Sequence, residues 1–158
     1  LAYDLYPDPN LDVEYTTLDD LLRRSDVVTL HCPLTNDSKY IINKNSISKM
    51  KDGVILVNTS RGALVDTVAL IDALRENKFR GVALDVYEEE DKYFFEDRSS
   101  DIIKDDDLIK LMAFPNVLVT SHQAFFTEES LEAIAKTTCE NLKAVEEGLP
   151  LENEVVSK

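Results

Sequence analysis

Short apolar runs alternate along the chain with stretches whose apolar residues recur at helical spacing. The clearest run, VILV at residues 54–57, is long enough for a buried strand and too short for a helix. It ends abruptly in polar residues, and the chain then turns at Arg61 and Gly62. Apolar positions return at helical spacing from Leu64 to about Asn77. The pattern predicts a strand, a turn and a helix in direct succession.

The same alternation extends over the whole chain. Further strands are predicted at 1–5, 27–30, 81–86 and 117–119. Further helices are predicted after an N-cap at Thr17, at 43–50, near 108–112, and from an N-cap at Thr127 to residue 147, where Gly148 and Pro150 end the chain's helical pattern. Residues 87–101 are predicted to be irregular. Short strands that alternate with helices are typical of an α/β fold with a parallel sheet.

Residues that could perform chemistry stand at the ends of three predicted strands, namely Arg61, Asp85 and His122. In open parallel sheets, ligands bind outside the carboxyl ends of the strands. The planar fork of an arginine matches a carboxylate in two parallel hydrogen bonds, and Gly62 fits a turn that a Cβ would obstruct. A plainer interpretation stays open for each residue, because a surface arginine and a structural histidine are both common after strands.

The other polar residues near these strand ends are less informative. Acidic runs are usually solvated, and we expect this of Glu88 and Glu89. His31 is expected to be structural. Asp4 closes the first predicted strand. A carboxylate at the end of the second strand of a dinucleotide fold binds the adenosine ribose, but the chain has only four glycines and no G-x-G-x-x-G loop.

Composition narrows the class of protein. The 158 residues are 44% hydrophobic and 30% charged, as in ordinary globular domains. The net charge of −14 argues against nucleic acid or anionic lipid as a partner, since both select basic surfaces. No apolar run approaches the roughly 20 residues of a membrane span. Cys32 and Cys139 fit no metal-ligand pattern, so we expect no metal, and two such thiols favour a reducing, cytoplasmic location.

Four motifs in order carry a resemblance to a known family. HCPLT (31–35), VNTSRGALVD (57–66), VALDVYEEE (82–90) and SHQAFFTEE (121–129) resemble the D-isomer-specific 2-hydroxyacid dehydrogenases. The HQAFFT form and the acidic insertion after DVY are most similar to the D-lactate dehydrogenase branch. Ala124 stands where other branches carry glycine, and Asp91 where the wider family often has proline. Both departures fit the lactate branch.

The resemblance implies a fold and a division of the chain. It implies a Rossmann-type, doubly wound parallel sheet that binds NAD and lacks its first strand and glycine loop. Residues 1–147 would form this partial NAD-binding domain, long terminal helix included, and residues 148–158 a tail that would pack on an absent catalytic domain. Such a fragment is expected to be inactive alone, and the whole protein is expected to be a homodimer.

The resemblance also implies roles for individual residues. His122 would be the acid and base at the substrate oxygen, Glu90 would pair with His122 and keep it protonated, and Arg61 would grip the substrate carboxylate. Asp4 would hold the adenosine ribose and favour NAD over NADP. The remaining cofactor contacts would be Cys32, Pro33, Ser38, Thr59, Ser60, Arg61 and Asp85.

Pyruvate and D-lactate are the expected substrates, and two alternatives remain. One is a D-2-hydroxyacid dehydrogenase for a bulkier keto acid, since Phe125 and Phe126 suggest an apolar wall without setting its size. The other is a non-catalytic NAD-sensing interaction module, as in the co-repressor relatives of this family. Such relatives can retain the arginine, glutamate and histidine, so these three residues do not separate the two.

Overall fold

A computed structural model describes the chain at residues 1–93 and 102–156. Part of the segment predicted to be irregular, residues 94–101, lies outside the described residues. The described residues fall into two compact units, one within residues 1–122 and the other within residues 123–158. The predicted domain division at residue 147 concerns the complete protein and stays a prediction.

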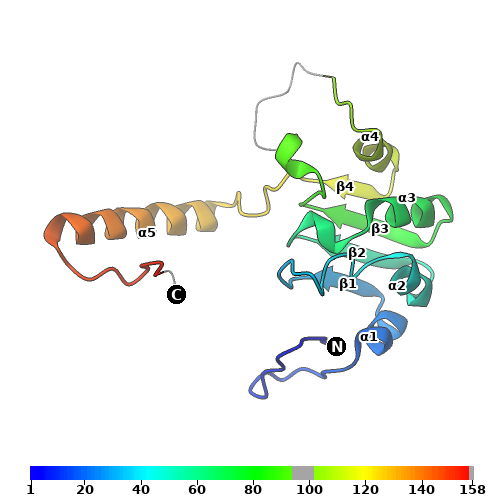
Figure 1. Cartoon of the computed structure of the whole chain (residues 1–158), viewed down its shortest axis with the longest axis horizontal. Helices are drawn as coiled ribbons and strands as arrows, with labels where there is room; N and C mark the ends of the chain where they lie inside the picture. Colours follow the sequence, from blue (N-terminus) through cyan, green and yellow to red (C-terminus); the bar gives the residue numbers. More distant parts are fainter. Residues whose placement is uncertain (94–101, 157–158) are drawn as a thin grey trace. The chain divides into compact units, whose positions relative to one another are not determined.

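Within the described part of the first unit, four parallel strands form one sheet (Figure 1). The strands are β1 (Val27–Leu30), β2 (Val54–Asn58), β3 (Phe79–Leu84) and β4 (Val117–Val119), side by side in sequence order. All adjacent pairs are parallel. The predicted α/β parallel sheet of Rossmann type is confirmed, although β3 begins and ends two residues earlier than expected. With parallel strands in sequence order, every strand brings its carboxyl end to the same edge.

In the described part of the first unit, one α-helix precedes the sheet, and three α-helices and two 3-10 turns connect its strands. The helices are α1 (Leu18–Arg24), α2 (Lys44–Lys49), α3 (Thr67–Arg75) and α4 (Asp106–Ala113), and the turns are η1 (Gly62–Leu64) and η2 (Glu90–Lys92). Thr17 caps α1 as predicted, accepting from the Asp20 N–H. The helix predicted from Leu64 is divided, because Asp66 caps α3 by accepting from the Ala69 N–H. Residues 62–64 therefore form a separate turn, η1.

The core lies between one face of the sheet and a row of helices. Helices α1 and α2, α2 and α3, and α3 and α4 are packing neighbours. Alternate strand residues, such as Val28, Leu56 and Val82, point into this layer and are almost fully buried. Burial of each such side chain stabilises the fold by about 1.5–3 kcal/mol. On the other strand positions, Val27 is 52% and Leu118 59% exposed, so the core is one-sided.

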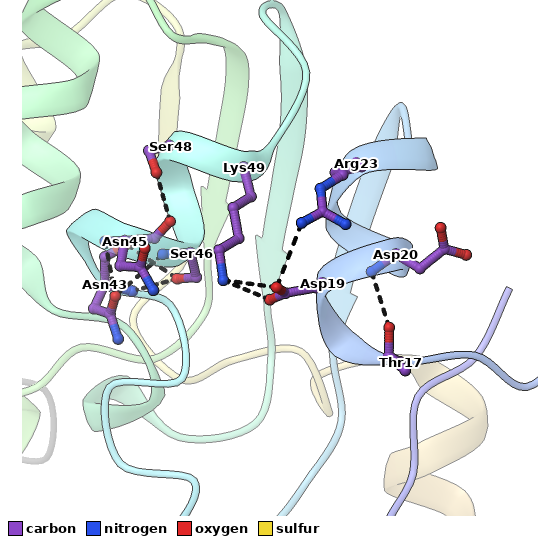
Figure 2. Close-up of polar contacts among 9 residues, drawn as sticks. All are labelled: Thr17, Asp19, Asp20, Arg23, Asn43, Asn45, Ser46, Ser48 and Lys49. Atoms are coloured by element: carbon purple, nitrogen blue, oxygen red, sulfur yellow. Dashed lines mark hydrogen bonds and ion pairs between the residues drawn. The ribbon is translucent and has the colours of Figure 1, made fainter.

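Polar contacts fix α1 against α2 (Figure 2). The Lys49 ammonium donates to both carboxylate oxygens of Asp19, at 2.7 and 2.8 Å. The hydrogen bond from Lys49 lowers the pKa of Asp19 below its ordinary value. Asn43 and Ser46 form a reciprocal capping box at the start of α2. Two short helices are thereby fixed both at an end and to each other.

The strand predicted at residues 1–5 is wrong. Ala2 makes one isolated parallel bridge to Tyr15, with its N–H donating to the Glu14 carbonyl and its carbonyl accepting from the Thr16 N–H, each at 2.9 Å. Asp4 then accepts from the Tyr6 N–H at 2.8 Å, which turns the chain. The extended segment therefore ends before a second ladder pair can form.

The second unit contains the long helix α5 (Glu128–Glu147), which is confirmed with its predicted caps. Thr127 accepts from the Ser130 N–H, and Gly148 follows the helix at φ +66°, in the left-handed region that glycine tolerates best. The apolar positions of this helix are nevertheless exposed, for example Ile134 at 52% and Leu142 at 66%. Among the residues described, none of the helices combines the length and apolar character needed to cross a membrane.

Candidate active site at the carboxyl edge of the sheet

The turn after β2 is built on a fully buried asparagine. The Asn58 side chain donates to the Arg61 carbonyl at 2.8 Å and accepts from the Ser60 N–H at 3.1 Å. Its backbone carbonyl accepts from the Asp85 N–H at 2.9 Å. One side chain therefore shapes the turn, while the backbone of the same residue continues the ladder to β3. Asn58 therefore fixes the position of the Arg61 backbone.

Gly62 brings this turn into direct contact with the segment after β3. A Cβ at Gly62 would lie 2.0 Å from the Tyr87 carbonyl carbon and 2.4 Å from the Glu88 nitrogen. Both distances are far below ordinary contact, and both partners are backbone atoms that cannot rotate away. A Cβ is excluded at Gly62, as predicted, but the backbone of the neighbouring segment excludes it and not the turn itself. The carboxyl ends of β2 and β3 are consequently locked together.

The segment after β3 places two carboxylates differently. Asp85 is buried and accepts from the Thr120 hydroxyl, so it ties β3 to the segment after β4. Glu90 lies in η2, and one of its carboxylate oxygens accepts from the Tyr87 N–H at 2.9 Å. The Glu90 side chain is therefore held back against the end of β3.

His122 is positioned by an unusual backbone. Ser121 and His122 have φ values of +52° and +57°, in the left-handed region that few non-glycine residues occupy. The His122 N–H donates to the Asp85 carbonyl. Backbone strain of this kind is concentrated at functional sites, where surrounding contacts maintain it. The bend after β4 turns the imidazole toward the segment after β3.

Glu90 and His122 meet across this edge. The His122 Nδ1 lies 3.1 Å from a Glu90 carboxylate oxygen, and the two side chains are 33% and 13% exposed. With a carboxylate as acceptor, Nδ1 carries the hydrogen, and acid–base chemistry would fall to the other ring nitrogen, Nε2. The arrangement can hold a proton and release it.

The third expected catalytic residue, Arg61, lies at the neighbouring strand end. Its guanidinium donates to the Ser60 carbonyl at 2.7 Å and is exposed. An exposed planar cation on a rigid turn can receive a carboxylate from solution. The structure thus brings Glu90 and His122 into contact and places Arg61 on the adjoining turn of the same edge.

Six of the expected cofactor residues follow the ends of β1 and β2, namely Cys32, Pro33, Ser38, Thr59, Ser60 and Arg61, whereas Asp85 follows β3 and Asp4 lies before α1. The Ser60 hydroxyl donates to the Cys32 carbonyl at 2.8 Å, and the Ser38 hydroxyl donates to the Pro33 carbonyl at 2.7 Å. Burial raises the pKa of the Cys32 thiol, and the Asp4 charge adds to this effect. Thr59 and Asp4 are exposed. A carboxylate and several hydroxyls beside one strand edge suit the ribose and amide groups of a dinucleotide.

The sequence patterns did not predict the roles of Asn58 and Glu88. Asn58 was not singled out, although asparagine directly after an apolar strand is a recognised turn signal. The expectation for Glu88 is wrong, because its half-buried carboxylate accepts from two hydroxyl groups. Glu89 is exposed and pairs with Lys92, as expected of a solvated acid. His31 is exposed, with Nε2 2.9 Å from the Thr29 hydroxyl.

Comparison with known proteins decides the family. The family model for the NAD-binding domain of D-isomer-specific 2-hydroxyacid dehydrogenases matches residues 1–124. The chain belongs to this family. The expected cofactor, NAD, is the one this domain of the dehydrogenases binds. The residues at the strand ends fit its ribose and nicotinamide portions, whereas no residues of a glycine-rich phosphate loop occur in the sequence.

Individual dehydrogenases are similar over most of the chain. A 2-hydroxyacid dehydrogenase A from Aspergillus oryzae is 57% identical over 130 residues, which are 82% of this chain and 38% of the relative. D-lactate dehydrogenase from Escherichia coli is 48% identical over 159 aligned positions, covering 99% of this chain and 48% of the relative. The crystal structure of a D-lactate dehydrogenase from Treponema pallidum has a TM-score of 0.89 at 39% identity, with 98% and 47% coverage. The chain therefore spans about half the length of the curated relatives it matches, or less.

Proposed function

We propose that this chain is the cofactor-binding part of an NAD-dependent D-lactate dehydrogenase, which interconverts pyruvate and D-lactate. The contact between Glu90 and His122 is the observation that carries the proposal. Reduction of a 2-keto acid requires a proton for the developing alkoxide and a cation for the substrate carboxylate. His122 and Arg61 supply these two groups from the same edge of the sheet.

Each residue has a defined part in the proposed reaction. The Arg61 guanidinium receives the pyruvate carboxylate in two parallel hydrogen bonds. His122 donates the Nε2 proton to the substrate oxygen during reduction and takes it back during oxidation. Glu90 stabilises the imidazolium, and it fixes the tautomer of the neutral ring by accepting from Nδ1. NADH, when bound, supplies the hydride, while the protein supplies position and electrostatics.

Cofactor contacts follow from the positions already described. Asp4 would bind the adenosine ribose, and its charge would repel a 2′-phosphate, which favours NAD over NADP. Cys32, Pro33 and Ser38 would line the adenosine and pyrophosphate. The nicotinamide side would be lined by Thr59, Ser60, Arg61 and Asp85. We further propose that the full-length protein is a cytoplasmic homodimer, in which residues 1–147 belong to the NAD-binding domain and residues 148–158 pack on a separate catalytic domain.

Two substrates are considered for the enzyme, pyruvate and a bulkier keto acid. Similarity to D-lactate dehydrogenases over nearly the whole chain supports pyruvate. A relative from Clostridium sporogenes named as an aromatic 2-oxoacid reductase, 42% identical over 148 residues, favours a second candidate, a bulkier keto acid. Hydrophobic pockets discriminate side chains by size, so kinetics with substrates of graded size separates the two.

The test is NADH oxidation by the full-length protein with pyruvate, 2-ketobutyrate and phenylpyruvate, followed by chiral analysis of the product. We expect D-lactate, with kcat/KM for pyruvate about tenfold or more above that for phenylpyruvate. A preference for phenylpyruvate would identify the bulkier-substrate enzyme. Tight NADH binding without reduction of any keto acid would refute catalysis and favour the sensing module.

A further inference from the structure

Glu88 joins three segments of the first unit. Its carboxylate accepts hydrogen bonds from the hydroxyl groups of Tyr40 and Thr67. Tyr40 lies before α2, and Thr67 is the first residue of α3. Thr67 is buried, and Tyr40 and Glu88 are half-buried. A carboxylate that accepts two hydroxyl groups in a partly dry environment is held more firmly than a solvated one. Glu88 is therefore fixed in place.

The fixed carboxylate lies next to the contact that locks two strand ends. The Glu88 nitrogen and the Tyr87 carbonyl occupy the space where a Cβ of Gly62 would be. Tyr40 is bound to the same turn through its backbone, since its N–H donates to the Ala63 carbonyl at 2.9 Å. Glu88 thus holds the segment after β3 against the turn after β2 in two ways. Its backbone contacts Gly62, and its side chain binds Tyr40, which is itself bound to Ala63.

The candidate catalytic residues extend from this locked contact. Arg61 directly precedes Gly62, and Glu90 follows Glu88 by two residues. The Glu90 carboxylate is also held by the Tyr87 N–H. A displacement of the 87–88 backbone would move Glu90 relative to His122 and move the turn that carries Arg61.

We propose that Glu88 is a positioning residue, which acts through Tyr40 and Thr67 to hold Glu90 at His122. The proposal rests on the proposed function for its kinetic readout. The hydrogen bond to Glu88 raises the pKa of Tyr40 to about 12, with burial and the charges of Asp66 and Glu89 adding to it. Tyr40 therefore remains a hydroxyl donor throughout the range in which the enzyme would be assayed.

The test compares Glu88→Ala, Glu88→Gln and Glu89→Ala in the full-length protein, by the pH profile of kcat/KM for pyruvate. Loss of both hydroxyl contacts in Glu88→Ala is expected to move the alkaline limb to lower pH, because the opposite charge at His122 is displaced. Glu88→Gln should retain most of the wild-type profile, since an amide can accept one hydroxyl and donate to the other. The matched control, Glu89→Ala, removes an exposed acid from the same segment and should leave the limb in place.

The three variants separate geometry from charge. Glu88→Gln removes the same charge as Glu88→Ala, so an equal shift in both variants would overturn the positioning role in favour of a charge effect. A lower melting temperature for Glu88→Ala with an unmoved limb would overturn it in favour of a purely structural role. If Glu88→Ala does not fold, Tyr40→Phe deletes one of the two contacts, and it is expected to move the limb in the same direction by a smaller amount. An unmoved limb in that variant would contradict the proposal.

A failure of the proposed function gives a different result. Wild-type protein that reduces no keto acid refutes catalysis and removes the kinetic readout. The His122 imidazole can then be titrated by NMR, with its signal assigned from a His122→Gln variant. A titration midpoint that moves to lower pH in Glu88→Ala and stays in Glu88→Gln supports the positioning role, and an unchanged midpoint in Glu88→Ala overturns it.

Discussion

Gly62→Ala tests the contact on which the candidate site depends. The new methyl group would meet the Tyr87 carbonyl carbon at 2.0 Å, its oxygen at 2.2 Å and the Glu88 nitrogen at 2.4 Å. Ordinary contact begins at 3.4 Å, so the turn after β2 and the segment after β3 must separate by more than an ångström. Both sides are backbone, and no side-chain rotation can relieve the clash.

The expected cost follows from this displacement. Overpacking of a closely packed region destabilises a protein by about 1–3 kcal/mol, and a backbone-to-backbone clash belongs at the upper end. Catalysis should suffer more than stability, because Arg61 and Glu90 lie on the two segments that separate. A misplacement of about 1 Å at reacting groups can reduce the rate about a hundredfold. We therefore expect kcat/KM for pyruvate to fall by about two orders of magnitude.

The assay combines urea unfolding with NADH oxidation in the full-length protein. Gly81→Ala is the matched control, because its Cβ would meet only the Asn116 carbonyl at 3.9 Å, an ordinary contact. This control should keep its stability and activity. A Gly62→Ala variant as stable and as active as Gly81→Ala would refute the close approach of the two strand ends.

Three further predictions address the catalytic residues and the helix contact. His122→Ala should lower kcat about a hundredfold or more while NADH affinity, measured by fluorescence, stays nearly unchanged; an unaltered kcat would exclude the acid–base role. Arg61→Lys keeps the charge but loses the fork, so the KM for pyruvate should rise, and normal kinetics would remove Arg61 from the site. Asp19→Asn should destabilise the fold in urea at neutral pH. Lys49 lowers the pKa of Asp19 below its ordinary value of 3.8. The difference in unfolding free energy between wild type and variant should therefore be complete above pH 3.8 and disappear as the pH falls through the lower pKa of the folded state. Added salt should also reduce this difference. A pH-independent difference would contradict the ion pair.

Local patterns predicted most of the fold. The apolar run at 54–57 became β2 with alternate residues buried, and the caps at Thr17 and Thr127 start α1 and α5 as expected. These features depend on neighbouring residues, which the sequence shows directly. The segment at 1–5 resembles a strand equally well, but a strand needs a partner ladder, and only Ala2 has one within the described residues. Pairing is a tertiary property that a single segment does not encode.

Only part of the candidate site was predicted from the sequence, for the same reason. The position of Arg61, Asp85 and His122 at strand ends follows from the order of strands in a parallel sheet. The left-handed backbone of Ser121 and His122 and the burial of Glu88 do not follow from strand order, because they depend on contacts between segments far apart in sequence. Glu88 and Glu89 are adjacent and identical, yet one is held by two hydroxyl groups and the other is exposed. Composition and spacing cannot separate such neighbours.

Glu90→Gln tests the pairing of Glu90 with His122, on which the proposed acid–base chemistry depends. The measurement is the pH dependence of kcat/KM for pyruvate in the full-length wild-type and variant proteins. The amide keeps the shape of the side chain and removes the charge that stabilises the imidazolium at 3.1 Å. The alkaline limb should therefore move to lower pH. A limb that stays at its wild-type position would show that Glu90 is not the partner of the catalytic histidine.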